Sequence, residues 1–199
     1  MVISVLYRKI LSGSILLLTL FSHSVSAEET DKLSFGNPNS NISIYLFTDW
    51  FCAGCVRLEP KIAILFPDFE KKAKIYFIDK TVVPETKNYT PYNLAFMTNN
   101  KKDYLEIRKE LQEVAVRHRK PTPEQISKAM DAIGVKYQPL NEKDLKSGIQ
   151  FFETTIKKYD VDATPTAVVV NKTNDKFKKL EGGKITERGL DKAIEELTK

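Results

Sequence analysis

Two cysteines stand three residues apart where a predicted strand passes into a predicted helix. They are the only cysteines of the 199-residue chain and form Cys52-Ala53-Gly54-Cys55. Residues 42–47 read as a buried strand, and residues 56–66 read as a helix in which Pro60 predicts a kink. A C-x-x-C pair in this setting indicates dithiol chemistry. The helix N-terminus favours an anion, and the thiolate is the reactive form of cysteine.

The first 27 residues have the pattern of a secretory signal peptide. Arg8 and Lys9 precede an apolar run over residues 10–21, and Val25-Ser26-Ala27 supplies small residues for cleavage. We therefore expect cleavage after about Ala27 and export to the periplasm. An uncleaved anchor is the alternative, although the apolar run is short for a transmembrane helix.

The mature chain, residues 28–199, is long enough for one domain with a substantial core. It carries 29 basic and 26 acidic residues, a net charge of +3, and the two signs are interleaved. This pattern predicts solvated helix faces and no nucleic-acid partner. The basic run 117–120 is either a polyanion contact or, as we favour, a helix end that offsets the helix dipole.

An exported chain folds in an oxidising compartment, where cysteines usually form structural bridges. A bridge between Cys52 and Cys55 closes a very short loop and restrains the unfolded chain little, so redox use is the better interpretation. A metal site needs more ligands than the mature chain's one histidine, His118, for which we expect a packing or surface role. We expect no metal and no cofactor beyond a redox-active Cys52–Cys55 disulfide.

The remaining pattern predicts a strand over residues 74–78, parallel to the first and joined to it by the cysteine helix. Residues 35–39 indicate a turn before the first strand. A helical block follows from about residue 91 to 160, with helices predicted over 91–98, 103–118, 123–133 and 142–159. Strands over 166–170 and 177–180 then form an antiparallel hairpin, and Thr186 caps a final helix.

Pro165 stands directly before the strand that starts at Thr166. Proline has no N–H for a strand ladder, so it suits a strand's first position. X-Pro bonds in tight turns can be cis, and we expect that form here.

These motifs, in this order, resemble the thioredoxin-fold disulfide oxidoreductases of bacterial envelopes, most closely the DsbA-like group. The resemblance rests on residues 35–38, the C-x-x-C helix and the segment Ala163-Thr164-Pro165-Thr166. It implies an α/β thioredoxin fold, with a core of about 40–82 and 161–199 and a helical domain inserted at about 91–160. The insertion separates a βαβ half from a C-terminal ββα half and caps the substrate groove.

The resemblance also implies roles for individual residues. Cys52 is the expected nucleophile and Cys55 the resolving thiol, with Pro165 facing the pair in the cis form. Thr164 is expected to offer its backbone to a bound substrate segment as a short strand pairing. From the sequence itself, Trp50 and Phe51 are expected to flank the pair and to present an apolar surface to an unfolded chain, although ordinary packing also explains Trp50.

Two departures from the family pattern stand out. The buried acid that many relatives place six residues before the first cysteine is Leu46 here, which leaves Asp49, Glu59 or water as the proton acceptor. The dipeptide Ala53-Gly54 lacks both the histidine of strong oxidases and the proline of reductases. We therefore expect a less oxidising protein than the archetype.

The sequence thus predicts an exported thiol–disulfide oxidoreductase that forms disulfides in secreted or periplasmic proteins. Its expected partners are unfolded or cysteine-containing exported proteins and a membrane redox protein that recycles the dithiol. A disulfide isomerase or reductase is the alternative within the class. A non-redox chaperone or binding module, or a metallochaperone, is the alternative outside it.

Overall fold

The computed structural model describes residues 31–199, so the predicted signal peptide lies outside the described residues. Five strands form one sheet in the order β1-β3-β2-β4-β5. Strand β2 is parallel to β3, whereas β4 is antiparallel to both β2 and β5, and β1 is antiparallel to β3. The strands are β1 (Phe35–Gly36), β2 (Ile42–Thr48), β3 (Lys74–Asp79), β4 (Thr166–Asn171) and β5 (Phe177–Glu181).

Strand β2 lies at the centre of the sheet and leads directly to the cysteines. All seven of its residues are buried, because helices cover both faces of the sheet. Leu46 sits opposite Phe77 of β3 and Ala167 of β4, so the position at which relatives carry an acid belongs here to the apolar core.

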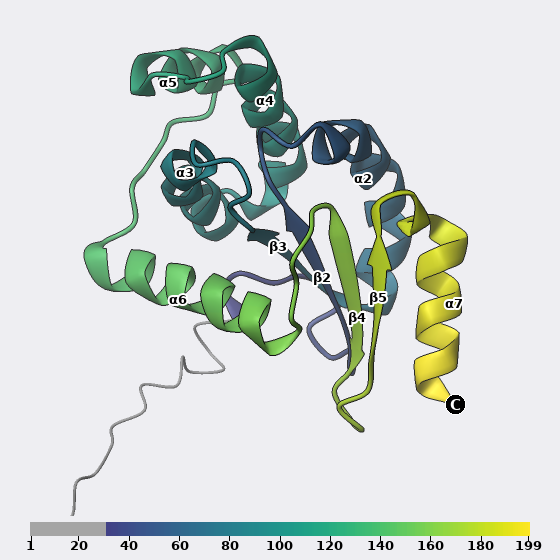
Figure 1. The fold of residues 1–199 in the computed structure, drawn as a ribbon. Coiled ribbons are helices and arrows are strands. Elements are labelled where there is room, and N and C mark those ends of the chain that lie inside the picture. The colour runs from purple at the N-terminus through teal and green to yellow at the C-terminus, as the bar shows by residue number, and fades with distance from the viewer. Residues whose placement is uncertain (1–30) are drawn as a thin grey trace, which may run out of the picture.

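Helices α2 (Ala53–Lys72) and α7 (Glu187–Thr198) cover one face of the sheet, as Figure 1 shows. Lys72 Nζ joins the two helices through Asp191 Oδ1 at 2.7 Å. Helix α6 (Glu142–Lys158) covers the opposite face, where Phe151 lies with its ring centroid 5.6 Å from that of Tyr76. Each face of the sheet therefore has its own apolar layer.

Four helices separate β3 from β4: α3 (Thr86–Asn99), α4 (Tyr104–Arg117), α5 (Pro123–Ala132) and α6. Helix α4 packs on α2, and α5 packs on α4. Thr122 and Gln125 form a capping box at the start of α5, and Asn141 caps α6, as their sequence positions indicate. Within residues 31–199, no helix combines the length and the apolar character needed to cross a bilayer.

Three element boundaries differ from the sequence prediction. Phe35 and Gly36 form a short edge strand on β3 and not a turn, because two residues are too few to show the alternation of a strand. Gly36 has φ +79°, and a Cβ there would lie 2.5 Å from the carbonyl oxygen of Ala73, so only glycine fits. Helix α2 continues to Lys72 with both Pro60 and Pro67 inside it, and α3 begins at Thr86 rather than near residue 91.

Candidate dithiol site

The two sulfurs occupy unequal positions at the start of α2. Cys52 is the N-cap residue and is partly exposed, whereas Cys55 lies in the first turn and is 1% exposed. Both are free thiols in this structure. The Cys52 thiol donates to the carbonyl oxygen of Thr164 at 3.5 Å, and the Asp49 N–H donates to Cys55 Sγ at 3.3 Å. One sulfur therefore faces the surface and the other faces the protein interior.

The surroundings shift the pKa values of the two thiols in opposite directions. Burial by itself would raise the pKa of Cys52, but contacts with Thr164 and with the backbone N–H groups of Cys55 and Gly54 outweigh it, so the net pKa is lowered. Burial raises the pKa of Cys55 to about 12. Cys52 is therefore the sulfur that is disposed to become a thiolate.

The peptide bond between Thr164 and Pro165 is cis, as the sequence predicts. The Pro165 ring packs so closely on Gly54 that a Cβ at Gly54 would lie 2.9 Å from Pro165 Cδ. A proline ring has little freedom to move away. A larger side chain at this position, such as the histidine that strong oxidases carry, would push the two loops apart.

Thr164 presents its backbone beside Cys52. Its carbonyl oxygen accepts only the Cys52 thiol, and its N–H donates to no other residue among 31–199. The carbonyl of Pro165, in contrast, already accepts the N–H of Gly182 at 2.9 Å. An extended segment next to Cys52 would find its backbone partners at Thr164.

Asp49 holds together the two loops that surround the cysteines. Its carboxylate accepts backbone N–H groups from Phe51 at 2.8 Å, Val82 at 2.7 Å and Val83 at 2.8 Å. These bonds tie the β2–α2 loop to the β3–α3 loop. Asp49 thus has a clear structural role, and its buried carboxylate has three donors of its own.

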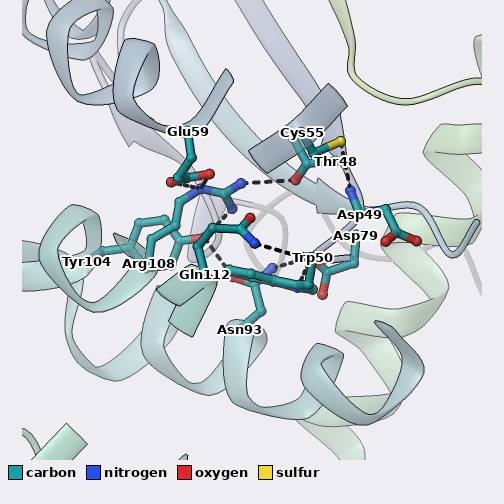
Figure 2. A network of polar contacts seen from close by, with 10 residues as sticks. All are labelled: Thr48, Asp49, Trp50, Cys55, Glu59, Asp79, Asn93, Tyr104, Arg108 and Gln112. Atoms are coloured by element: carbon teal, nitrogen blue, oxygen red, sulfur yellow. Dashed lines mark hydrogen bonds and ion pairs between the residues drawn. The ribbon is translucent and has the colours of Figure 1, made fainter. Parts of the chain in front are cut away.

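Behind the cysteines, α4 contributes a buried row of polar side chains at intervals of one helical turn: Tyr104, Arg108 and Gln112 (Figure 2). Gln112 Nε2 donates to the carbonyl oxygen of Trp50 at 2.6 Å, and the Arg108 guanidinium lies 4.9 Å from the centre of the Trp50 ring. The segment that carries Cys52 is therefore anchored in the helical insertion.

Arg108 is 1% exposed, and all its polar contacts lie inside the protein. Its Nε contacts both carboxylate oxygens of Glu59, at 2.9 and 3.1 Å, and its Nη2 donates to Thr48 Oγ1 at 3.0 Å. Burial raises the pKa of Glu59 although Arg108 opposes the rise. A buried pair of this kind is stable only while both partners are present.

Asp79, at the end of β3, is the second buried acid of this network. Its Oδ1 accepts the indole N–H of Trp50 at 3.0 Å and the side-chain amide of Asn93 at 2.9 Å, while Oδ2 has no hydrogen-bond partner among the described residues. Burial raises the pKa of Asp79 to about 7, against an opposing effect of Arg108. Near neutral pH this carboxyl is therefore partly protonated.

The structure corrects one predicted site residue. Trp50 is 2% exposed, so it presents no surface to a substrate, and the packing interpretation holds. Phe51 is only half-buried, with its ring edge-on to that of Tyr89 at 5.3 Å. Val82, which is 53% exposed on the loop held by Asp49, is an apolar neighbour that the sequence did not single out.

The residues of the basic run 117–120 contact neighbouring side chains. Arg117, the last residue of α4, contacts Glu113, Lys120 contacts Glu85, and His118 contacts Gln125. Among residues 31–199, no group of three histidine, cysteine, aspartate or glutamate side chains is placed to hold a metal ion.

The model of the thioredoxin family matches residues 28–196 of the sequence. The chain belongs to the thioredoxin family. The resemblance inferred from the motifs is confirmed, as is the predicted fold class, a thioredoxin fold with a helical insertion. No curated protein matches the sequence.

Solved structures share this fold at low sequence identity. A periplasmic thioredoxin-like protein from Salmonella enterica serovar Typhimurium is 16% identical, with a TM-score of 0.62 over 88% of this chain and 99% of that one. The catalytic domain of Proteus mirabilis ScsC is 19% identical, with a TM-score of 0.59 over 88% and 98%. The thiol-disulfide exchange protein alpha-DsbA2 from Wolbachia pipientis is 20% identical, with a TM-score of 0.58 over 85% and 92%.

Proposed function

We propose that this protein is an exported thiol–disulfide oxidoreductase that transfers disulfides to secreted or periplasmic proteins through Cys52 and Cys55. The observation that carries the proposal is the inequality of the two sulfurs, one accessible with a lowered pKa and one buried with a raised pKa. The signal-peptide pattern of residues 1–27 and the periplasmic thioredoxin-like neighbour support export to the periplasm.

The difference in exposure and pKa between the two sulfurs gives each cysteine a different role in the exchange reaction. A substrate thiolate attacks Sγ of Cys52 in the Cys52–Cys55 disulfide, and the bond breaks with its electron pair on Cys55, which takes up a proton because of its high pKa. A second substrate thiolate then attacks the substrate sulfur of the mixed disulfide, and Cys52 leaves as the stabilised thiolate. The substrate loses two electrons to the protein and gains a disulfide.

The loops around Cys52 supply the substrate contacts. The N–H of Thr164, which has no partner within residues 31–199, suits the backbone of an extended segment, which would add a short strand beside the cis-proline. Phe51 and the exposed Val82 would contact the apolar side chains of an unfolded chain.

The stabilised Cys52 thiolate favours the reduced protein, which makes the disulfide form an oxidant. The direction of transfer is therefore toward substrate oxidation, with a membrane redox partner needed to restore the disulfide. Because Gly54 brings no histidine to the thiolate, we expect a potential between the values of about −120 mV for DsbA and about −270 mV for thioredoxin. A measured potential below the thioredoxin value would mean that the protein acts as a reductase and not as an oxidase.

A trapping experiment tests the dithiol role. The oxidised protein is mixed with an unfolded, reduced test protein, and mixed disulfides are separated on a non-reducing gel. With a test protein that carries a single cysteine, Cys55→Ser protein activated as a mixed disulfide with glutathione should form a long-lived complex, because neither protein has a second thiol to resolve it, and Cys52→Ser should form none. If the test protein is oxidised at the wild-type rate in the presence of Cys52→Ser, the oxidation does not come from the dithiol. This result would overturn the redox function and favour a non-redox binding module.

A further inference from the structure

The sulfur of Cys55 is the leaving group of the exchange, and its surroundings must accommodate the charge that it receives. When a thiolate attacks Cys52 Sγ, the sulfur–sulfur bond breaks and its electron pair passes to Cys55 Sγ. Cys55 is 1% exposed, and burial opposes a charge there. Leu46, in the apolar core, stands where many relatives carry a buried acid. The group that acts on this sulfur therefore lies elsewhere.

The two acids of the buried network are not placed to act on the buried sulfur. Both oxygens of Glu59 contact Arg108 Nε, at 2.9 and 3.1 Å, so uptake of a proton by Glu59 would disrupt a buried ion pair. Asp79 accepts the indole N–H of Trp50 at 3.0 Å, and no hydrogen bond joins it to either sulfur within residues 31–199. The third buried acid, Asp49, has an atom in contact with that sulfur.

Asp49 contacts the buried sulfur through its backbone and not through its carboxylate. Its N–H donates to Cys55 Sγ at 3.3 Å, whereas its carboxylate points away from the sulfur (Figure 2). Oδ1 accepts the N–H of Phe51, and Oδ2 accepts those of Val82 and Val83. Uptake of a proton would weaken these three charge-assisted bonds. The carboxylate therefore suits an anchor, and the N–H suits a contact with a charged sulfur.

The anchored side chain fixes the direction of this N–H. Asp49 is 0% exposed. In the peptide group that carries the N–H, the carbonyl oxygen of Thr48 accepts the Lys80 N–H at 2.9 Å. The carbonyl oxygen of Asp49 accepts the Cys52 N–H at 3.3 Å. Residue 49 is thus held through the preceding peptide group, the side chain and the following peptide group, with one backbone group on each cysteine.

A backbone N–H in this position acts most strongly on a charged sulfur. A neutral sulfur is a weak acceptor, and a charged acceptor forms a much stronger bond, so the contact strengthens as the electron pair arrives. Burial has the largest effect on the pKa of Cys55 and raises it, the Asp49 N–H and the Thr164 side chain lower it, and the neighbouring Cys52 raises it. The N–H therefore offsets part of the cost of burial, and a leaving thiol with a lower pKa leaves faster.

We propose that Asp49 is a positioning residue for disulfide exchange: its carboxylate anchors the loop so that its backbone N–H stabilises the negative charge that develops on Cys55 Sγ. The proton that Cys55 then takes up comes from water. This inference rests on the proposed function, because it assigns a role within the exchange step. An N–H donor thus takes the place of the acid that is absent at Leu46.

Stepwise exchange with glutathione tests this role. Samples quenched with acid at intervals and analysed by mass spectrometry give the amounts of disulfide, glutathione mixed disulfide and dithiol, and hence a rate constant for each step. Cys55 leaves when glutathione attacks Cys52, and it attacks when it resolves the mixed disulfide. Asp49→Asn has one oxygen for three N–H groups, so both of these rate constants should fall by about tenfold at each pH between about 6 and 9.

The same experiment contains its own comparisons. The equilibrium constant of this step should change by less than about threefold, because Cys55 is a neutral thiol in the mixed disulfide and is charged only during the reaction. The step in which glutathione releases Cys52 from the mixed disulfide should be unchanged. Asp49→Ser, with a single oxygen, should show the same pattern and serves if Asp49→Asn does not fold. Asn174→Ala, which removes a similar bond to the Lys176 N–H in the β4–β5 turn, is the control and should match the wild type.

Three results would overturn the role of Asp49. The first is that both variants keep the wild-type rate constants for the steps of Cys55. The second is an equal fall in the step that releases Cys52, which would indicate a general loosening of the site. The third is a wild-type pH profile with an inflection that Asp49→Asn abolishes, which would make the carboxylate the proton acceptor. No exchange between the wild type and glutathione would overturn the proposed function as well, whereas these three results leave it intact.

Discussion

The two ends of β2 carry different kinds of buried polar group. At the carboxyl end, the buried ions Glu59 and Arg108 contact each other, and Arg108 also reaches Thr48 and the Trp50 ring. At the amino end, the hydroxyls of Ser43 and Tyr159 have no hydrogen-bond partner within residues 31–199. Buried polar groups in stable proteins are usually satisfied. Asp79 Oδ2 near the carboxyl end also lacks a partner within residues 31–199, so the two ends differ in charge and not in how completely their polar groups are paired: the carboxyl end holds a buried ion pair, and the unpaired groups of the amino end are hydroxyls.

Removing Arg108 tests the carboxyl end of β2, and it has the largest expected effect on stability. Arg108→Met leaves Glu59 buried without its partner and should lower the free energy of unfolding by about 3–5 kcal/mol. Urea unfolding measures the change. Adding Glu59→Met to this variant should recover much of the loss, because a pair of apolar side chains leaves no buried charge.

The neighbouring Lys109 provides the matched control for Arg108. Its side chain is 69% exposed, with Glu113 at 3.8 Å, so Lys109→Met should change the free energy of unfolding by about 1 kcal/mol or less. Equal losses for the two variants would show that the buried pair has no special role.

The pH dependence of stability gives the next largest effect. Asp79 has a folded-state pKa of about 7, above its ordinary value, so the folded protein binds the proton more tightly than the unfolded chain does. The stabilisation from this proton is complete below about pH 4 and is lost as the pH rises to about 7, a change of a few kcal/mol.

Asp79→Asn removes this titration while it keeps an oxygen for the Trp50 and Asn93 donors. The wild type should lose stability relative to Asp79→Asn between about pH 4 and pH 7, and the difference should level off above that range. Urea unfolding of both proteins across this range measures it. A constant difference between the two would mean that Asp79 titrates normally in the folded protein.

Two tyrosine-to-phenylalanine changes compare the ends of β2 directly. The Tyr104 hydroxyl donates to Asn93 Oδ1 at 2.6 Å, so Tyr104→Phe should lower the free energy of unfolding by about 1–2 kcal/mol. Tyr159→Phe removes a hydroxyl that makes no hydrogen bond within residues 31–199 and should leave stability unchanged or slightly higher. Thermal or urea unfolding separates them, and a larger loss for Tyr159→Phe would reverse the comparison.

The close approach of Gly54 to Pro165 gives the smallest effect. Gly54→Ala should destabilise the protein by about 1 kcal/mol, because the strain against Pro165 exceeds the gain in helix propensity. It should also slow disulfide exchange by displacing Thr164. The control is Gly183→Ala, where a Cβ would meet no atom within 4 Å. If the Gly54→Ala protein is as stable as the Gly183→Ala protein and exchanges disulfides as fast, the two loops move apart freely.

The order of elements and the dithiol could be predicted from the sequence because they depend on local signals. Strand and helix periodicity, the C-x-x-C spacing and the proline before β4 each act over a few residues. The buried acids and their partners were not accessible in this way. Arg108 and Asp79 have charged side chains, which ordinarily face solvent, and their partners lie on other elements.

One signal for the buried network is nevertheless present in the sequence. Tyr104, Arg108 and Gln112 recur every four residues beside the apolar stripe of α4, so they share one face of the helix. Their burial depends on the packing of α4 against α2, which no local pattern specifies. The exposure of Trp50 was misjudged for the same reason, because α4 covers it.

The most direct test of the account is to titrate each thiol by the ultraviolet absorbance of its thiolate, with Cys52 measured in Cys55→Ser and Cys55 measured in Cys52→Ser. We predict that the pKa of Cys52 lies below the ordinary cysteine value of about 8.5 and that Cys55 stays protonated to a much higher pH. Equal pKa values for the two thiols, or a lower value for Cys55, would contradict it.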